Sequence, residues 1–340
     1  MKVSRWMLVA GTTAIVVALT LAGSIGAGKA PAAAAVAFKT ALVLDTGGPN
    51  DNGFNANQVV GLNVATAQIH GTKLLLLSNS SSDYSGNYTT AIGANSNLII
   101  GAGFLLGSTV QNFAQANPGT KFAITDDPAV AVGGGANVMG ITYKSNQAGC
   151  LAGVLAAKEA QNLGHKVIGA VGGIKIPPVD IWIAGYKFCA QKAVPGTTVL
   201  VTYSGNFGSD PSACATLAAN EMAQHAQVIF QVAGGCGIAA LQYAGTHGGW
   251  GIGVDSEEMG DAPNVLTSAL KKTDRGVETV ILKAFNHTWN GGHNVSLSLA
   301  NNGVGIGHID ASVPHAWIAL MNVYKSQILN GSLHPPVVLH

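Results

Sequence analysis

The chain has 340 residues, of which 48% are hydrophobic and only 10% charged, and its formal net charge is +1. A chain of this length usually divides into two compact units, each with its own core. Nucleic acid is not an expected partner, because the chain lacks the surplus of basic residues that binding a phosphate backbone requires.

The first 35 residues form a predicted signal peptide. Lys2 and Arg5 precede an apolar stretch from Trp6 to about Ile25, and an alanine-rich segment follows as far as Ala35. This is the order of a secretory leader. An apolar stretch of roughly 20 residues can also stay in place as an uncleaved membrane anchor, so cleavage is one of two alternatives. In both cases we expect the rest of the chain to lie outside the cytoplasm.

From residue 38 onward, short runs rich in valine, isoleucine and leucine alternate with longer segments of helical period. The alternation predicts βαβ units on parallel sheets. Ten strands are expected, which is more than one sheet comfortably holds and therefore favours two sheets. The predicted strands are Thr40–Leu44, Lys73–Leu77, Asn97–Ile100, Lys121–Ile124, Val138–Tyr143, Lys166–Val171, Thr198–Tyr203, Gln227–Gln231, Gly251–Val254 and Val265–Ser268.

Helices are expected between these strands, and right-handed crossovers place them on both faces of each sheet. The expected fold class is therefore α/β, with two lobes that are each a mostly parallel sheet flanked by helices. The predicted helices are Gly53–His70, Ser108–Ala116, Asn146–Gln161, Ile181–Ala193, Pro211–Ala226, Ile238–Gly245, Arg275–Thr288 and Val313–Leu329.

Glycines cluster directly after several predicted strands, as in Gly47-Gly48, Gly101-Ala102-Gly103, Gly172-Gly173 and Gly234-Gly235. In open α/β sheets, ligands bind at the carboxyl ends of the strands. Glycine at these places lets the backbone come close to a ligand. The pattern predicts a ligand cleft between the two sheets.

The four cysteines are Cys150, Cys189, Cys214 and Cys236. Export would place them in a compartment where disulfides persist. Three connectivities are possible; we favour Cys150 with Cys189, on helices expected to flank the same sheet, and Cys214 with Cys236. Four separate buried thiols are the alternative.

The stretch from Asp45 to Asn55 follows the first predicted strand and is rich in carboxylates and amides. Asp45 and Asp51 would repel a phosphate, so we expect a ligand with hydroxyl or amine donors. The structural alternatives are helix capping or turn formation by the two acids and core packing by Phe54.

At this stretch the chain resembles the basic membrane protein family of ABC-transporter substrate-binding lipoproteins, whose best understood members bind purine nucleosides. Asp45-Thr46-Gly47-Gly48 followed by Phe54-Asn55 is similar to the opening motif of the family, with Asn50 in place of the usual acid. Further matching stretches run in order along the chain: Leu98–Phe104, Lys121–Asp126, Lys144–Gly149, Gly172–Asp180, Ile252–Asp255 and Leu266–Lys271.

The resemblance implies a periplasmic-binding-protein fold with the ligand between the lobes. The lobes would be residues 36–143 plus about 269–302, and residues 144–268 plus about 303–340. It also implies that the protein acts as a monomer and delivers a nucleoside, most often a purine nucleoside, to the permease and ATPase subunits of an importer. Such a protein needs neither catalysis nor a cofactor.

The resemblance also implies the roles of eight residues. Phe54 and Phe207 would stack on the base, a contact worth about 1–3 kcal/mol per base in other proteins. Asp126 would accept hydrogen bonds from the base edge, and Asp255 and Lys271 would bind the ribose hydroxyls. The other predicted pocket residues are Asp45, Asn55 and Gly234.

Each of these residues also has a purely structural interpretation. Phe207 would pack in its loop, Asp126 would cap the next segment, and Asp255 would form a strand-end turn. One of the neighbours Lys271 and Lys272 is expected to be an ordinary surface lysine, and the motif spacing favours Lys271 for the site.

The leader departs from the family. Leu21-Ala22-Gly23-Ser24 has serine where a lipoprotein signal has its cysteine, and the first cysteine of the chain is Cys150. We therefore expect a protein without a lipid on a leader cysteine.

Three other functions compete with transport. Gly101, Gly103 and Gly107, with Asp126 about twenty residues on, partly match a dinucleotide fingerprint, but the spacing is wrong for it. A nucleoside hydrolase could hold calcium on the Asp45–Asp51 loop, although no hydrolase motif is present in the sequence. A receptor that feeds a sensor kinase would use the same pocket.

Overall fold

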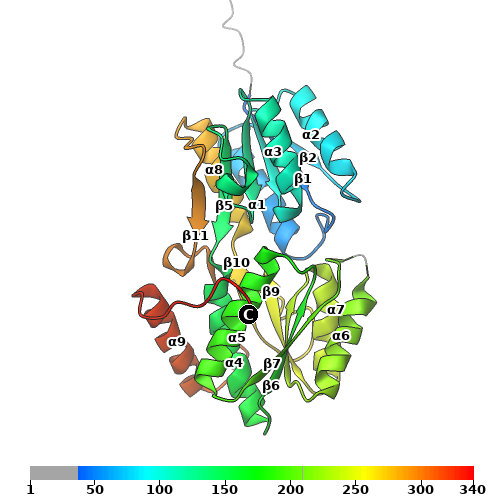
Figure 1. Ribbon diagram of the computed structural model, residues 1–340, viewed down its shortest axis with the longest axis vertical. Coiled ribbons are helices and arrows are strands. Elements are labelled where there is room, and N and C mark those ends of the chain that lie inside the picture. The colour runs from blue at the N-terminus through cyan, green and yellow to red at the C-terminus, as the bar shows by residue number, and fades with distance from the viewer. Residues whose placement is uncertain (1–36, 209) are drawn as a thin grey trace, which may run out of the picture. The chain divides into compact units, whose positions relative to one another are not determined.

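The computed structural model describes residues 37–208 and 210–340. The predicted signal peptide, residues 1–35, lies outside the described residues. Residues 37–340 form one compact unit that contains two six-stranded sheets (Figure 1). The predicted fold class, two mostly parallel sheets flanked by helices, is confirmed.

The first sheet is parallel throughout, in the order β11-β5-β4-β3-β1-β2. Buried apolar residues of α1 and α8 pack on one face of this sheet, and those of α2 and α3 pack on the other. Its elements are β1 (Lys39–Leu44), α1 (Phe54–Gln68), β2 (Thr72–Leu76), α2 (Asp83–Gly93), β3 (Leu98–Ala102), α3 (Gly107–Ala116), β4 (Lys121–Thr125), β5 (Val138–Tyr143), α8 (Thr273–Phe285) and β11 (Asn294–Leu297), with short 3-10 turns at Phe104–Leu106 and Ala129–Val132.

The second sheet has the order β12-β10-β9-β8-β6-β7, and only β12 is antiparallel to its neighbour. Helices α4 and α5 pack on one face, and α6 and α7 on the other. Its elements are α4 (Ser145–Asn162), β6 (Val167–Gly172), α5 (Pro177–Ala193), β7 (Thr198–Tyr203), α6 (Pro211–Ala223), β8 (Val228–Val232), α7 (Gly235–Thr246), β9 (Trp250–Asp255), β10 (Val265–Lys271), β12 (Val304–Ile306) and α9 (His315–Leu329), with a 3-10 turn at Leu299–Asn301.

Strand burial explains why these segments form central strands. Every residue of β3 and β8 is buried, as are five of the six residues of β1. Parallel strands that are covered on both faces have such continuous apolar runs. The edge strand β2 is largely exposed, as expected where helices cover a sheet incompletely.

Three elements are absent from the sequence prediction. The sequence of α2 contains glycines and threonines, which favour a helix weakly, although Tyr84, Tyr88 and Ala91 are buried on one side of it. The strands β11 and β12 are short edge strands of four and three residues, too short to give a clear alternating pattern.

Five predicted boundaries were wrong by three or four residues: the start of α5, the end of β10, the end of α6, the start of α7 and the end of α8. Helix α5 begins at Pro177 instead of Ile181, because proline is tolerated in the first turn of a helix, where its missing N–H is not needed. Strand β10 continues to Lys271 instead of ending at Ser268, which places Lys271 at the carboxyl end of the strand.

Both favoured disulfides are confirmed. Cys150 of α4 is bonded to Cys189 of α5, with their Cα atoms 4.9 Å apart, and Cys214 of α6 is bonded to Cys236 of α7, with their Cα atoms 5.7 Å apart. All four cysteines of the sequence are therefore paired within the second sheet and its helices.

Candidate functional site

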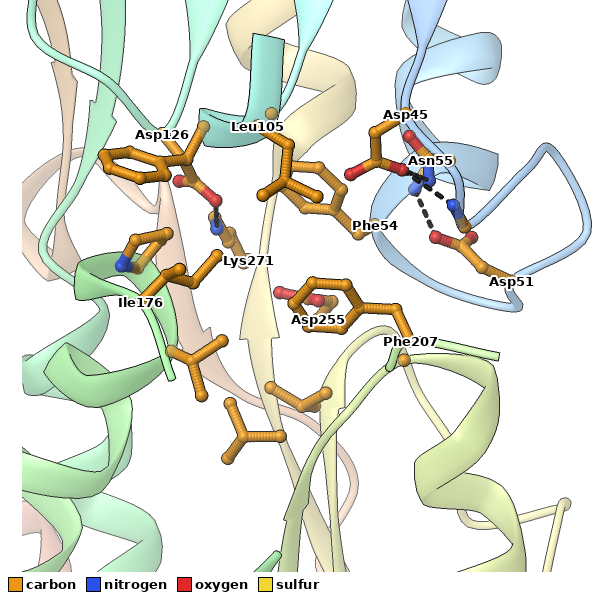
Figure 2. A pocket seen from close by; sticks show the side chains of 18 of the residues that line it. Asp45, Asp51, Phe54, Asn55, Leu105, Asp126, Ile176, Phe207, Asp255 and Lys271 are labelled. Atoms are coloured by element: carbon orange, nitrogen blue, oxygen red, sulfur yellow. Dashed lines mark hydrogen bonds and ion pairs between the residues drawn. The ribbon is translucent and has the colours of Figure 1, made fainter. Parts of the chain in front are cut away.

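A pocket lies between the carboxyl ends of strands from the two sheets. The empty space between its walls, including the part open to solvent, is about 580 Å³. All eight residues singled out from the sequence line this pocket: Asp45, Phe54, Asn55, Asp126, Phe207, Gly234, Asp255 and Lys271. Figure 2 shows Phe54, Asp126, Phe207, Asp255 and Lys271 around the same space.

Asp45 and Asn55 form the polar wall contributed by the first sheet. Asn55 Nδ2 donates to Asp45 Oδ1 at 2.7 Å, and the amide of Gly47 donates to the same oxygen at 2.9 Å. Burial raises the pKa of Asp45 to about 6, against the opposing effect of these hydrogen bonds. Asn55 Oδ1 is buried and has no hydrogen-bond partner, so this wall offers an unused acceptor.

Asp51 has the capping role that the sequence left open. Its carboxylate accepts backbone N–H groups from Gly53, Asn55 and Ala56 at 2.7–3.1 Å. These bonds satisfy donors of the first turn of α1. Asp51 also lines the pocket, but within the described residues all of its hydrogen bonds go to the start of the helix that carries Phe54 and Asn55.

Phe54 lies at the first residue of α1, and the backbone beside it needs a glycine. Gly103 has a φ of +120°, and a Cβ at this position would lie 3.0 Å from Asp45 Oδ2 and 3.2 Å from the Phe54 ring. Only glycine adopts this conformation easily and leaves this space free. The glycine after β3 thus serves close packing between the loop and the pocket wall.

Phe207 comes from the loop after β7 and packs on glycines of the second sheet. Its carbonyl lies 3.2 Å from where a Cβ of Gly234 would be, and Gly234 has a positive φ of 55°. The Phe207 side chain lies below Phe54 in Figure 2, and both residues line the pocket. Two phenyl rings from different sheets therefore border one space.

Lys271 and Asp126 form an ion pair between the ends of β10 and β4, that is, between the two sheets. Lys271 is only 2% exposed, and its ammonium group lies 4.7 Å from the centre of the Phe54 ring and 4.9 Å from that of Tyr143. Burial raises the pKa of Asp126, and Lys271 opposes this effect. Of the two neighbouring lysines, Lys271 is therefore the one in the pocket, as the motif spacing favoured.

Asp255 lies in a tight turn at the end of β9. Its φ is +63°, and the amide of Ser256 donates to the carbonyl of Val254 across it at 2.7 Å. Non-glycine residues in this region are uncommon and often mark functional sites. Burial raises the pKa of Asp255 to about 7, with Lys271 as the main opposing effect. Its Oδ1 atom is buried without a hydrogen-bond partner.

The sequence prediction missed the apolar side of the pocket. These residues come mainly from the 3-10 turn after β3 and from the start of α5, and although several lie in stretches that match the family, none was assigned to the pocket. They are Phe104, Leu105, Ile176, Pro178, Val179, Trp182, Val232 and Val254.

Loops of the two sheets also touch at the rim of the pocket. Asn57 Nδ2 donates to Ser256 Oγ at 2.8 Å, and Asn52 Nδ2 donates to Asp261 Oδ2 at 2.7 Å. A Cβ at Gly53 would lie 3.5 Å from Asp255 Cβ. The described conformation is thus one in which the two sides of the cleft are in contact.

A model of the PnrA-like ABC transporter substrate-binding proteins matches residues 38–330, nearly all of the described chain. The chain belongs to this family. The sequence-based resemblance to the basic membrane proteins is confirmed by the match and by the names of several relatives, such as basic membrane protein D of Borreliella burgdorferi, which is 29% identical over 272 residues, or 79% of this chain and 78% of that one.

Two other relatives cover most of the chain. A CD4+ T-cell-stimulating antigen of Listeria monocytogenes is 28% identical over 321 residues, 88% of each chain. The ABC transporter nucleoside-binding protein BmpA of Lactococcus lactis is 29% identical over 321 residues, 88% of this chain and 89% of that one. Among solved structures, a solute-binding protein of an ABC transporter system from Aeropyrum pernix K1 superposes with a TM-score of 0.78 at 21% identity, over 88% of this chain and 94% of that one.

Members of this family act outside the cytoplasm, as substrate-binding proteins of transporters. In residues 37–208 and 210–340, none of the helices has the length and apolar character needed to cross a bilayer. The same residues contain no group of three or more metal-ligating side chains arranged to hold an ion.

Proposed function

We propose that the ligand of this substrate-binding protein is a nucleoside, with purine nucleosides first. The observation that carries the proposal is the combination of two phenyl rings and two unpartnered buried oxygen atoms, Asn55 Oδ1 and Asp255 Oδ1, around one pocket. A ligand that satisfies this wall needs flat apolar faces and hydroxyl or amine donors. A base and a ribose supply both.

In this proposal, Phe54 and Phe207 stack on the two faces of the base. Asp126 accepts hydrogen bonds from the base edge, and Asp255 accepts them from the ribose hydroxyls. Lys271 stays beside Asp126 and donates to a ribose oxygen, while Asp45, Asn55 and Gly234 complete the pocket. The ligand therefore brings hydrogen-bond donors to acceptors that burial has already desolvated.

The charge of the pocket argues against a phosphorylated ligand. Four acids, Asp45, Asp51, Asp126 and Asp255, face one cation, Lys271. A phosphate would be repelled by the surplus of carboxylates. The protein is therefore expected to bind the nucleoside in preference to the nucleotide.

We further propose that the ligand shifts the protein from an open to a closed state. The proposed lobes are residues 36–143 plus about 269–302 and residues 144–268 plus about 303–340, with hinges near Tyr143, near Ser268 and after about Asn302. Because β10 of the second sheet runs to Lys271, the second of these hinges is placed directly after that residue. The rim contacts of Asn52 and Asn57 support a closed state in which the two lobes share hydrogen bonds.

The mature protein is proposed to act as a monomer that presents the ligand to the permease and ATPase of the importer. The leader is proposed to direct export, and Ser24 leaves no cysteine there for a lipid. Ligand is released unchanged, since transport needs no covalent step and no cofactor. Incubation with inosine and Ca²⁺ should release no ribose; ribose release would indicate a hydrolase.

Isothermal titration of the purified protein with guanosine, adenosine, inosine, cytidine and uridine tests the ligand class. Matched titrations with guanosine monophosphate and free ribose serve as controls. We expect binding of at least one purine nucleoside, with affinity at least tenfold weaker for the nucleotide and for ribose. Equal affinity for nucleoside and nucleotide, or no binding by any nucleoside, would contradict the proposal.

A further inference from the structure

Two buried polar side chains, Gln231 and Glu258, lie behind the pocket wall of the second sheet. Their exposed fractions are 0% and 1%, and neither lines the pocket. Gln231 Nε2 donates to Glu258 Oε2 at 2.6 Å. Buried polar pairs of this kind are costly unless their bonds are all made, so a satisfied pair usually fixes local geometry.

Each member of the pair also binds the backbone next to a pocket residue. Gln231 Oε1 accepts the amide of Ala233 at 3.0 Å, directly before Gly234. Glu258 Oε2 accepts the amide of Val254 at 3.0 Å, directly before Asp255. The pair thus connects the two loops that contribute Gly234 and Asp255.

The register of the sheet shows why side chains are needed here. The pairing of β8 with β9 runs from Val228 opposite Trp250 to Phe230 opposite Ile252 and then stops. Val254 lies two residues beyond the last pair, so its amide has no strand partner on this side. The Glu258 carboxyl group supplies the acceptor that β8 would otherwise provide for the Val254 amide. The loops after β8 and β9 can therefore separate and turn toward the pocket.

Glu258 is itself anchored to the neighbouring strand β10. Its amide donates to Ser268 Oγ at 2.9 Å, and Ser268 Oγ donates to Glu257 Oε1 at 3.1 Å. The turn at Asp255 therefore lies between two fixed points, the Val254 amide and the Glu258 backbone. A left-handed aspartate persists only where its surroundings hold it in place.

We propose that Gln231 and Glu258 are positioning residues of the binding site, which hold the Asp255 turn and the Gly234 loop in the geometry that receives the ligand. The inference rests on the proposed function for its effect on affinity. The hold on the turn itself is independent of the identity of the ligand.

The test compares Glu258→Leu and Glu258→Gln with the unchanged protein. In the ligand-free proteins, hydrogen exchange of the Val254 and Ser256 amides is measured by mass spectrometry of short peptides. Titration with the tightest-binding nucleoside is then measured for each. We expect Glu258→Leu to speed the exchange and to weaken binding by about tenfold, the scale of one lost buried hydrogen bond. Glu258→Gln keeps an acceptor oxygen and should restore both.

Glu221→Leu is the matched control, because Glu221 is an equally buried glutamate of the same lobe that binds Thr202 at 2.8 Å and lies away from the pocket. It should leave the exchange of the Asp255 turn unchanged. Should Glu258→Leu not fold, Gln231→Met serves in its place, with the same expected effect on both loops.

Unchanged exchange at the turn in a folded Glu258→Leu or Gln231→Met variant would overturn the inference, whatever the ligand. Faster exchange with unchanged affinity would also overturn it, since the turn would then not matter for binding. If the exchange responds as expected but the unchanged protein binds no nucleoside, the hold on the turn stands and the proposed ligand class fails.

Discussion

Asp126 and Asp255 occupy similar places in the two sheets, each at the carboxyl end of a central parallel strand with a left-handed backbone, with φ values of 66° and 63°. Their partners differ. Asp126 forms an ion pair with Lys271, whereas Asp255 has an oxygen without a partner. One acid of the pocket is therefore already neutralised by the protein, while the other has an oxygen that no described side chain satisfies.

The largest expected effect comes from removing the cation of the ion pair. Lys271→Met leaves Asp126 buried without its partner, and breaking a buried pair in this way typically costs about 3–5 kcal/mol. We expect the urea midpoint of unfolding to fall by a corresponding amount. Lys272→Met, one residue along and outside the pocket, is the matched control and should have little effect. Equal midpoints for the two variants would mean that the ion pair is not important for stability.

Removing the unpartnered acid should separate binding from stability. Asp255→Ala is expected to weaken nucleoside binding by about tenfold or more, roughly 1.4 kcal/mol, because the ligand loses hydrogen bonds to a charged group. Stability should not fall, since a buried carboxylate without a partner is itself unfavourable. Titration and urea unfolding of the same preparation check both statements. Unchanged affinity would remove Asp255 from the site.

The pH dependence of stability sharpens the difference further. Burial raises the pKa of Asp255 to about 7 in the folded protein, whereas an aspartate in the unfolded chain titrates near 3.9. The folded state then holds an extra proton, so this contribution to stability is complete below about pH 4 and is lost as the pH rises through 7. Unfolding midpoints of ligand-free Asp255→Asn, measured between pH 4 and 8, should fall less with pH than those of the unchanged protein. Parallel curves would contradict the raised pKa.

The smallest effect is expected at the rim, where the contacts between the two sides involve neither Asp126 nor Asp255. Asn57→Ala removes the hydrogen bond to Ser256, and such bonds contribute about 0.5–1.5 kcal/mol. We expect a two- to tenfold loss of nucleoside affinity through a less favoured closed state. Asn63→Ala is the matched control on the same helix, because Asn63 binds Lys73 of its own lobe. A similar loss in both variants would argue against closure through the rim.

Much of the fold could be predicted from the sequence because the central strands are buried on both faces. Their continuous apolar runs are visible without a structure, as in the segment that became β5, whose bounds were predicted at both ends. The short edge strands β11 and β12 escaped prediction because three or four half-exposed residues carry no clear period. Helix α2 was not predicted because glycine and threonine, which favour a helix only weakly, lie among its buried tyrosines.

The polar side of the site could also be predicted, chiefly through the family resemblance, and its acids Asp45, Asp126 and Asp255 lie at the carboxyl ends of strands. The ion pair between Asp126 and Lys271 was not, because it joins residues 145 positions apart that local patterns cannot connect. The same holds for Gln231 and Glu258, whose role depends on where the pairing of two strands stops. The two disulfides were contacts between elements that could be predicted, whereas these polar contacts between elements could not.

The two disulfides lie on opposite faces of the second sheet, and the first lobe has none, because all four cysteines are used there. Maturation of the two halves is therefore unequal. The half built on the first sheet can reach its final form by folding alone, whereas the other half also requires an oxidant outside the reducing cytoplasm. A ligand pocket that needs both halves would then be completed only after export, which would keep the protein from capturing its cargo inside the cell that made it.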